Sequence, residues 1–189
     1  MISKITNILF PSLTFIFFLT SQVFAEQNKP HVHGTSQLTI ASENNILHIQ
    51  LQSPLMDIVG FETQPKTKKQ KESLSLAEST LKNWEKIFKF NGSSCKKTKI
   101  IVSSNKEVEN HAHGHDHDHG KHKHKEQIVH NEIEAFYEFS CSKINNLDSL
   151  DIYLSDIFTG VEKVNVQWVS TDGQGQILLN KKQNRVIFR

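Results

Sequence analysis

The chain has 189 residues, among them 22 Lys and Arg, 20 Asp and Glu and 11 His, and 37% of the residues are hydrophobic. This composition excludes the collagen-like, fully disordered and multi-span membrane classes, and the length suits one domain. The formal net charge of +2 is too small and too evenly spread to indicate nucleic acid as a partner. Seven of the 11 histidines fall between His111 and His124, a clustering that needs its own explanation.

The first 25 residues have the pattern of a secretory signal peptide. A mostly apolar stretch covers residues 8–19, and small residues stand at positions −3 and −1 of a cleavage site after Ala25. A membrane anchor is the alternative, but an uninterrupted span needs about 20 apolar residues, and Pro11 and several polar residues break this stretch. We therefore expect export, and a mature chain of residues 26–189 that forms one domain without a membrane span.

Export determines how the two cysteines are interpreted. In an oxidising compartment Cys95 and Cys141 most simply form a disulfide with each other, which closes a loop around the whole histidine cluster. Two free thiols are the alternative. Metal ligation by these residues would be favoured in the cytosol, and the export signal argues against it.

Two segments near the start of the expected mature chain predict a β-hairpin. Residues 36–41 and 46–51 alternate between polar and apolar side chains, so each has one apolar face. The intervening Glu43-Asn44-Asn45 is typical of a turn. The two segments are therefore predicted to pair as antiparallel neighbours.

Residues 64–88 change to the period of a helix. Pro65 stands near the expected start, and Asn91-Gly92 turns the chain after the end. Lys and Glu occupy the remaining faces, so the segment is predicted to be an amphipathic helix that covers one face of a sheet. Its apolar stripe consists of Leu74, Ala77, Leu81, Trp84 and Phe88.

Residues 97–103 and 132–141 are predicted to form two further strands. If they are antiparallel neighbours joined by the disulfide, Ser103 lies opposite Ile133. Residues 104–131 then form the long end of a hairpin that the disulfide closes at its base.

The C-terminal part predicts short strands and turns. A turn or short helix is expected over residues 157–160 and a turn over residues 171–175. In total the sequence predicts an α+β fold with antiparallel sheets of about seven to eight strands, one main helix and a long mobile His-rich loop. The expected C-terminal strands are residues 150–154, 164–169, 176–180 and 185–188.

Residues 111–125 read HAHGHDHDHGKHKHK and contain no apolar residue except Ala112. Without an apolar face this segment cannot build a core, so we expect a mobile loop tip within residues 104–131. Neutral imidazole suits Zn²⁺, Cu²⁺ and Ni²⁺, and the His-x-His spacing lets neighbouring side chains close on one ion. A solvated insert that binds metal only incidentally is the alternative. We expect several weak, exchanging metal sites formed by His111, His113, His115, His117, His119, His122 and His124.

The four histidines outside the cluster differ in their setting. In an extended strand, His31 and His33 of the motif HVHG project to one face and form half of a metal site. His48 lies on the polar face of an alternating strand, where a surface or packing role is favoured. His130 stands where the expected loop re-enters a strand close to Glu132, so it is better fixed than the loop tip and can join a structured site.

Several features occur in one order along the chain. They are the signal peptide, HVHG at residues 31–34, SPLMDIVGFE at residues 53–62, the His-rich loop flanked by two cysteines, and GQGQ at residues 173–176. In this order they resemble the ZrgA-type family of periplasmic zinc-binding proteins from Gram-negative bacteria, over essentially the whole mature chain. The resemblance implies a periplasmic protein that binds Zn²⁺ and works beside components of a zinc importer, with no catalytic activity.

The resemblance also implies metal ligands. The family's N-terminal His-x-His matches both histidines of residues 31–33, and its Gly-Phe-Glu segment matches Glu62. In the family a His often follows Gly-Phe-Glu, whereas Thr63 stands there in this chain. If that His is a ligand, the structured site here is weaker, or it is completed by His130 or Glu132.

Rival functions stay open at this point. A metallohydrolase needs a rigid metal site with an open coordination position and a general base. The sequence has no His-Glu-x-x-His helix, no Gly-x-Ser-x-Gly elbow and no phosphate-binding glycine loop, so we do not expect an enzyme. A zinc- or pH-responsive adaptor or sensor, or a buffer for Cu²⁺ or Ni²⁺, is the alternative to zinc acquisition.

Overall fold

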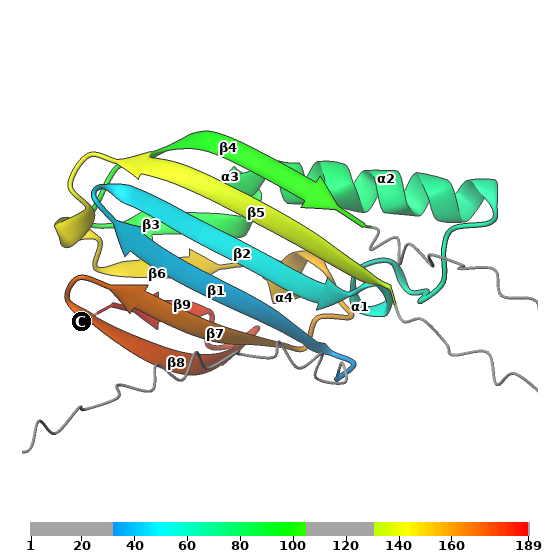
Figure 1. Cartoon of the computed structure of the whole chain (residues 1–189). Helices are drawn as coiled ribbons and strands as arrows, with labels where there is room; N and C mark the ends of the chain where they lie inside the picture. The colour runs from blue at the N-terminus through cyan, green and yellow to red at the C-terminus, as the bar shows by residue number, and fades with distance from the viewer. Residues whose placement is uncertain (1–31, 105–130, 189) are drawn as a thin grey trace, which may run out of the picture. The chain divides into compact units, whose positions relative to one another are not determined.

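A computed structural model describes residues 32–104 and 131–188 of the chain (Figure 1). The predicted signal peptide and the histidine cluster lie outside these residues. The larger sheet contains β1 (Thr35–Glu43), β2 (Ile46–Pro54), β4 (Cys95–Ser103), β5 (Glu132–Cys141), β7 (Lys163–Ser170) and β8 (Gly173–Asn180). The smaller sheet contains β3 (Phe88–Asn91), β6 (Ser149–Ile152) and β9 (Arg185–Ile187).

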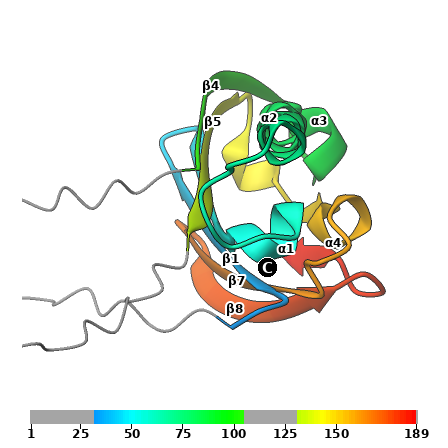
Figure 2. The same ribbon diagram turned by 90° about the vertical axis from the view of Figure 1, so that its right-hand side faces the viewer.

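The helices lie on one side of the larger sheet, together with the smaller sheet (Figure 2). The described ranges therefore form a β-rich fold with nine strands and one main helix, α2, where seven to eight strands were predicted. A short 3₁₀ turn spans Ile144–Asn146. The helices are α1 (Leu55–Val59), α2 (Lys68–Lys82), α3 (Trp84–Ile87) and α4 (Leu154–Ile157).

The predicted N-terminal hairpin is confirmed. β1 and β2 pair as antiparallel strands, with Glu43 opposite Ile46. Asn44 and Asn45, which connect them, both have positive φ angles, of 48° and 66°. A two-residue hairpin loop of this type needs positive φ at both positions, and Asn tolerates that conformation better than most residues.

One pair of strands contradicts the prediction of purely antiparallel sheets. The larger sheet has the order β4-β5-β2-β1-β7-β8, and in it β1 and β7 run parallel, with Thr35 opposite Lys163. A parallel pair needs a long crossover connection, which all the elements between the two strands provide here. The alternation of residues along a strand does not reveal which distant strand becomes its neighbour.

The helical segment is shorter than predicted and is interrupted. The Gln70 N–H donates to the Thr67 side-chain oxygen at 3.2 Å, and the Thr67 N–H donates to the Gln70 side chain at 3.0 Å. This capping box sets the start of α2 after Thr67. Asn83 has a non-helical backbone (φ −87°, ψ 71°) between α2 and α3, and Phe88 belongs to β3. The predicted helix over residues 64–88 is therefore wrong at both ends.

The apolar stripe of this segment lies against the larger sheet. Leu81 is fully buried, and its carbonyl accepts a 2.9 Å hydrogen bond from the Tyr137 hydroxyl, whose pKa burial raises far above its usual range. The ring of Trp84 lies 5.1 Å from that of Phe139, and the ring of Phe88 lies 5.1 Å from that of Tyr137. Residues of α3 and β3 pack against the same core as those of α2. The apolar residues therefore keep a helical spacing across the break at Asn83, and the sequence pattern does not reveal the break.

The predicted disulfide joins Cys95 of β4 to Cys141 of β5, with the two Cα atoms 4.0 Å apart. The two residues also face each other in the antiparallel β4–β5 pair. β4 is further connected to the helical layer at its end, where the Ser104 hydroxyl donates to a Glu78 carboxylate oxygen at 2.7 Å. The strands that flank the histidine-rich segment are therefore fixed at their base by a covalent bond.

The register of this pair differs from the prediction. Thr98 is an extra residue on β4, and its hydroxyl donates to the backbone and side-chain oxygens of Glu138 at 3.0 and 2.7 Å. This β-bulge shifts the pairing by one residue. Ser103 consequently lies opposite Glu134, and the predicted pairing with Ile133 is wrong.

An ion pair between the buried Asp151 and the half-exposed Arg185 stabilises the smaller sheet. Asp151 is 3% exposed and accepts hydrogen bonds from Arg185 Nε at 2.5 Å, Arg185 Nη2 at 3.0 Å and Asn91 at 3.4 Å. The bonds from Arg185 lower the pKa of Asp151 most. Because the folded pKa lies below the unfolded value, the pair stabilises the fold above the ordinary aspartate pKa of about 3.9. That contribution is lost as the pH falls through the folded pKa.

We expect Arg185→Gln to lower the melting temperature at neutral pH and to flatten its decline between about pH 5 and pH 2. The matched control is Lys181→Gln, which removes a cation 3.4 Å from the half-exposed carboxylate of Asp156. Exposed pairs contribute little, so the control should keep the wild-type profile. Thermal unfolding followed by circular dichroism at each pH measures both. An Arg185→Gln profile parallel to the wild-type one would contradict this account.

Candidate metal centre

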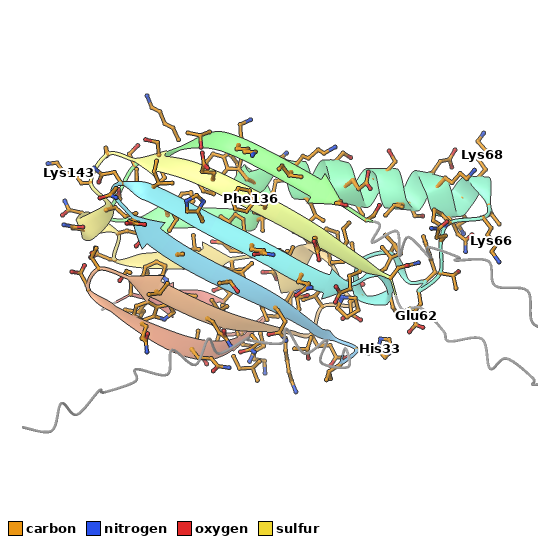
Figure 3. The ribbon with its side chains drawn as sticks, viewed as in Figure 1. His33, Glu62, Lys66, Lys68, Phe136 and Lys143 are labelled. Carbon is orange, nitrogen blue, oxygen red and sulfur yellow. A yellow bond between two sulfur atoms is a disulfide. The ribbon has the colours of Figure 1, made fainter. Side chains whose placement is uncertain are left out.

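The larger sheet brings the residues of the candidate site to one end of the fold. Because β1 and β2 are antiparallel, the start of β1 lies beside the end of β2. The chain enters β1 through His33 and leaves β2 into α1, which ends at Gly60 in the left-handed conformation (φ 82°). Glu62 follows this turn and lies at the same end as His33 (Figure 3).

His33 lies between two carboxylates. Its Nε2 is 2.9 Å from Oε1 of Glu62, and its Nδ1 is 4.0 Å from Oδ1 of Asp57. The side chain of His33 is 57% exposed and that of Glu62 is 23% exposed, whereas that of Asp57 is only 3% exposed. The half-exposed imidazole thus lies between one carboxylate that is partly accessible to solvent and a second carboxylate that is buried.

Backbone contacts hold the segment that carries His33. The Gly34 N–H donates to Oδ2 of Asp57 at 2.8 Å, and the Gly34 carbonyl accepts from Glu162 and Lys163 at 3.0 and 2.9 Å. Gly34 has a φ of 77°, which a residue with a side chain rarely adopts. The glycine of HVHG thus allows one turn to connect α1 and the start of β7.

The position of Glu62 depends on the start of β5. The Glu62 carbonyl accepts a hydrogen bond from the Asn131 N–H at 3.3 Å, and the Asn131 carbonyl accepts one from the Leu55 N–H at 2.8 Å. Asn131 directly follows His130 in the sequence. The chain therefore returns from the histidine-rich segment next to Glu62.

The imidazole of His33 and the carboxylate of Glu62 are two of the ligand types that Zn²⁺ takes. Among residues 32–104 and 131–188, no three His, Cys, Asp or Glu side chains are grouped so that they could hold a metal ion. Zinc sites in proteins use three or four protein ligands. In the described part of the chain, His33 and Glu62 thus provide two of the donor groups that such a site would need.

The structure brings together only some of the predicted ligands. His33 and Glu62 are adjacent, whereas Glu132 lies on β5 and accepts a hydrogen bond from the Gln52 amide at 2.9 Å. The other predicted ligands lie outside the described residues, namely His31, His130 and the clustered His111, His113, His115, His117, His119, His122 and His124.

His48 lies in the middle of β2, away from the candidate site. Its ring is 5.6 Å from that of Phe136, and its Nδ1 is 3.9 Å from a Glu138 oxygen. This setting agrees with the predicted surface or packing role.

Asp57 was not among the residues predicted from the sequence to belong to the site. This residue stands within the apolar stretch SPLMDIVGFE, and its side chain is buried in the structure. A buried carboxylate needs a hydrogen-bonding partner, which Gly34 supplies here. The feature of the sequence that could have indicated Asp57 is a single Asp in an apolar segment of a chain that also has a His-x-His motif.

The fold is β-rich, and one imidazole and one carboxylate lie in contact at one end of its larger sheet. A family model described as ZrgA family zinc uptake protein matches residues 30–188, and the chain belongs to this family. The resemblance inferred from the motifs is therefore confirmed, and membership indicates a role in zinc uptake. No curated protein matches the chain. In the ranges that the structure describes, no helix is long and apolar enough to span a membrane.

Proposed function

We propose that this chain is an exported, periplasmic zinc-binding protein that captures Zn²⁺ through histidines and passes it to components of a zinc importer. The observation that carries the proposal is the contact of 2.9 Å between His33 Nε2 and Glu62 Oε1 in a member of a zinc uptake family. The proposed role is binding and delivery, with no catalytic step.

The first part of the proposal is an ordered site. His33 and Glu62 supply two ligands, and His31 and His130 complete the set. Two sequence neighbours support this choice: His31 stands two residues before His33, and His130 directly precedes Asn131, whose N–H donates to the Glu62 carbonyl. This arrangement gives Thr63 no part in the site, so the absence of a His at that position is compensated from elsewhere.

The second part is a collecting segment. The seven histidines between residues 111 and 124 form several weak sites that exchange zinc with one another. Weak, competing ligand sets suit a protein that must release its metal to an importer. The disulfide between Cys95 and Cys141 agrees with an oxidising compartment such as the periplasm.

The ordered site is tested by substituting its ligands. We expect His33→Ala and Glu62→Gln each to weaken binding of the first equivalent of Zn²⁺ by about tenfold or more. Substituting a residue that only supports a metal ligand already lowers the metal affinity by about that factor. Competition against a chelator of known affinity measures this. His48→Ala is the matched control, because it removes an imidazole outside the site and should leave the affinity unchanged.

Equal affinities for the wild-type chain and His33→Ala would overturn the ordered site. The same titrations are to be made with Cu²⁺ and Ni²⁺, because an unselective imidazole site binds Cu²⁺ more strongly than Zn²⁺. Loss of binding for all three ions in His33→Ala would identify the site as a general site for divalent transition metals.

A further inference from the structure

The candidate metal centre contains a buried carboxylate that the proposed capture of zinc does not use as a ligand. Oδ2 of Asp57 accepts a hydrogen bond from the Gly34 N–H at 2.8 Å, and Oδ1 lies 4.0 Å from Nδ1 of His33. The Asp57 side chain is 3% exposed. The backbone therefore fixes one oxygen of this carboxylate, and the other oxygen faces the inner edge of the imidazole.

Geometry excludes Asp57 as a ligand of an ion that binds beside Glu62. The two nitrogens of an imidazole point away from each other, so a metal on Nε2 lies on the opposite edge of the His33 ring from Asp57. A histidine that binds a metal through one nitrogen commonly donates the N–H of the other to a carboxylate. That contact fixes the protonated nitrogen, orients the ring and raises the basicity of the ligating nitrogen.

We propose that Asp57 is a positioning residue for zinc binding by His33. The 2.9 Å contact with the Glu62 carboxylate places a ring proton on Nε2. Zinc must take the place of that proton, and Asp57 then stabilises the imidazole form that carries its proton on Nδ1 and offers the lone pair of Nε2 to the metal. The inference rests on the proposed function, because it requires His33 to be a ligand. The 4.0 Å separation exceeds a hydrogen bond, so the proposal requires the half-exposed ring to move toward Asp57 when Nε2 binds the ion.

Asp57 also has a purely structural role, as the acceptor for the Gly34 N–H, and Asp57→Asn separates the two roles. An asparagine side chain has one accepting oxygen and one donating NH₂ group. If the oxygen keeps the Gly34 contact, the NH₂ group faces Nδ1 of His33. Two donors then oppose each other, which favours the imidazole form with its proton on Nε2, the form that cannot ligate the ion there.

The experiment measures binding of the first equivalent of Zn²⁺ to the full chain by chelator competition. We expect Asp57→Asn to weaken the affinity by about ten- to hundredfold. The matched control is Asp172→Asn, which removes an equal charge from the exposed turn between β7 and β8 and should change the affinity by less than about twofold. Wild-type affinity in Asp57→Asn would overturn the proposal.

A double-mutant cycle tests whether Asp57 acts through His33. In the His33→Ala background, Asp57→Asn should have almost no further effect, and an equal loss in both backgrounds would overturn the positioning role. If His33→Ala alone leaves zinc binding unchanged, the ordered site itself is wrong. That result does not depend on Asp57, so the two failures are distinguishable.

A second measurement needs no variant and so does not depend on how Asp57→Asn folds. Nitrogen-15 spectra of the zinc-loaded wild-type chain, with His33 assigned by comparison with His33→Ala, report the state of both ring nitrogens. We expect a metal-bound Nε2 and a protonated Nδ1 whose proton exchanges slowly with water. Ligation of zinc through Nδ1 would overturn the proposal.

Discussion

Replacing the seven clustered histidines between residues 111 and 124 by asparagine is expected to remove most of the zinc that the full chain binds. The substitution keeps the length of the segment and removes seven of the chain's 11 imidazoles. Asparagine is a poor ligand for Zn²⁺, which prefers thiolate, imidazole and carboxylate. The number of bound ions should fall from several to about one, and the tightest site should keep its affinity.

Calorimetric titration at about pH 7.5 and about pH 5.5 measures this effect. Imidazole must be neutral to bind a metal, and its ordinary pKa is about 6.5, so zinc binding by the wild-type chain should weaken strongly in mild acid. Replacing four exposed lysines outside the cluster by glutamine is the control for a general loss of polar surface charge. An unchanged stoichiometry in the asparagine variant would show that the cluster does not collect zinc.

Removing the disulfide is expected to lower the free energy of unfolding by about 4 kcal/mol. Cys95 and Cys141 are 46 residues apart, and a cross-link that closes a loop of this length restricts the unfolded chain by that amount in the chain-entropy model. Urea denaturation of the Cys95→Ala/Cys141→Ala variant, against the oxidised wild-type chain, measures the difference. A loss below about 1 kcal/mol would mean that β4 and β5 hold their pairing without it.

The length of the loop that the disulfide closes is expected to have only a small effect on stability. Deleting residues 111–124 shortens the separation of 46 residues between the two cysteines by 14 residues. This changes the free energy of closing the loop by only about 0.3 kcal/mol. Both ends of the segment keep their contacts, since Ser104 donates to Glu78 and the Asn131 N–H donates to the Glu62 carbonyl. The deletion therefore serves as a second test of zinc stoichiometry in a chain of nearly unchanged stability.

Local patterns predicted local structure well. The alternation of residues 36–41 and 46–51 and the Asn44-Asn45 turn predicted the first hairpin, because pairing of adjacent segments depends on nearby residues alone. The failures are of another kind. The bulge at Thr98 and the break at Asn83 leave the surrounding hydrophobic pattern almost intact, so the pattern gives no sign of them.

Contacts between distant segments were beyond the reach of periodicity. The parallel pairing of β1 with β7 joins strands separated by most of the fold, and nothing in either strand specifies the partner. The candidate site has the same character. His33 was named through its His-x-His motif and Glu62 through the family resemblance. Their contact with each other, and the approach of Asp57 to His33, depend on how α1 and Gly60 turn the chain.

The most direct test of the account is anomalous diffraction at the zinc absorption edge from crystals of the zinc-loaded protein. We expect an anomalous peak beside Glu62, at about 2.0–2.1 Å from Nε2 of His33 and about 2.0–2.2 Å from a carboxylate oxygen. We also expect the Nδ1 edge of the same ring to face Asp57. Zinc bound only at other positions, with no peak near His33 and Glu62, would contradict the central claim.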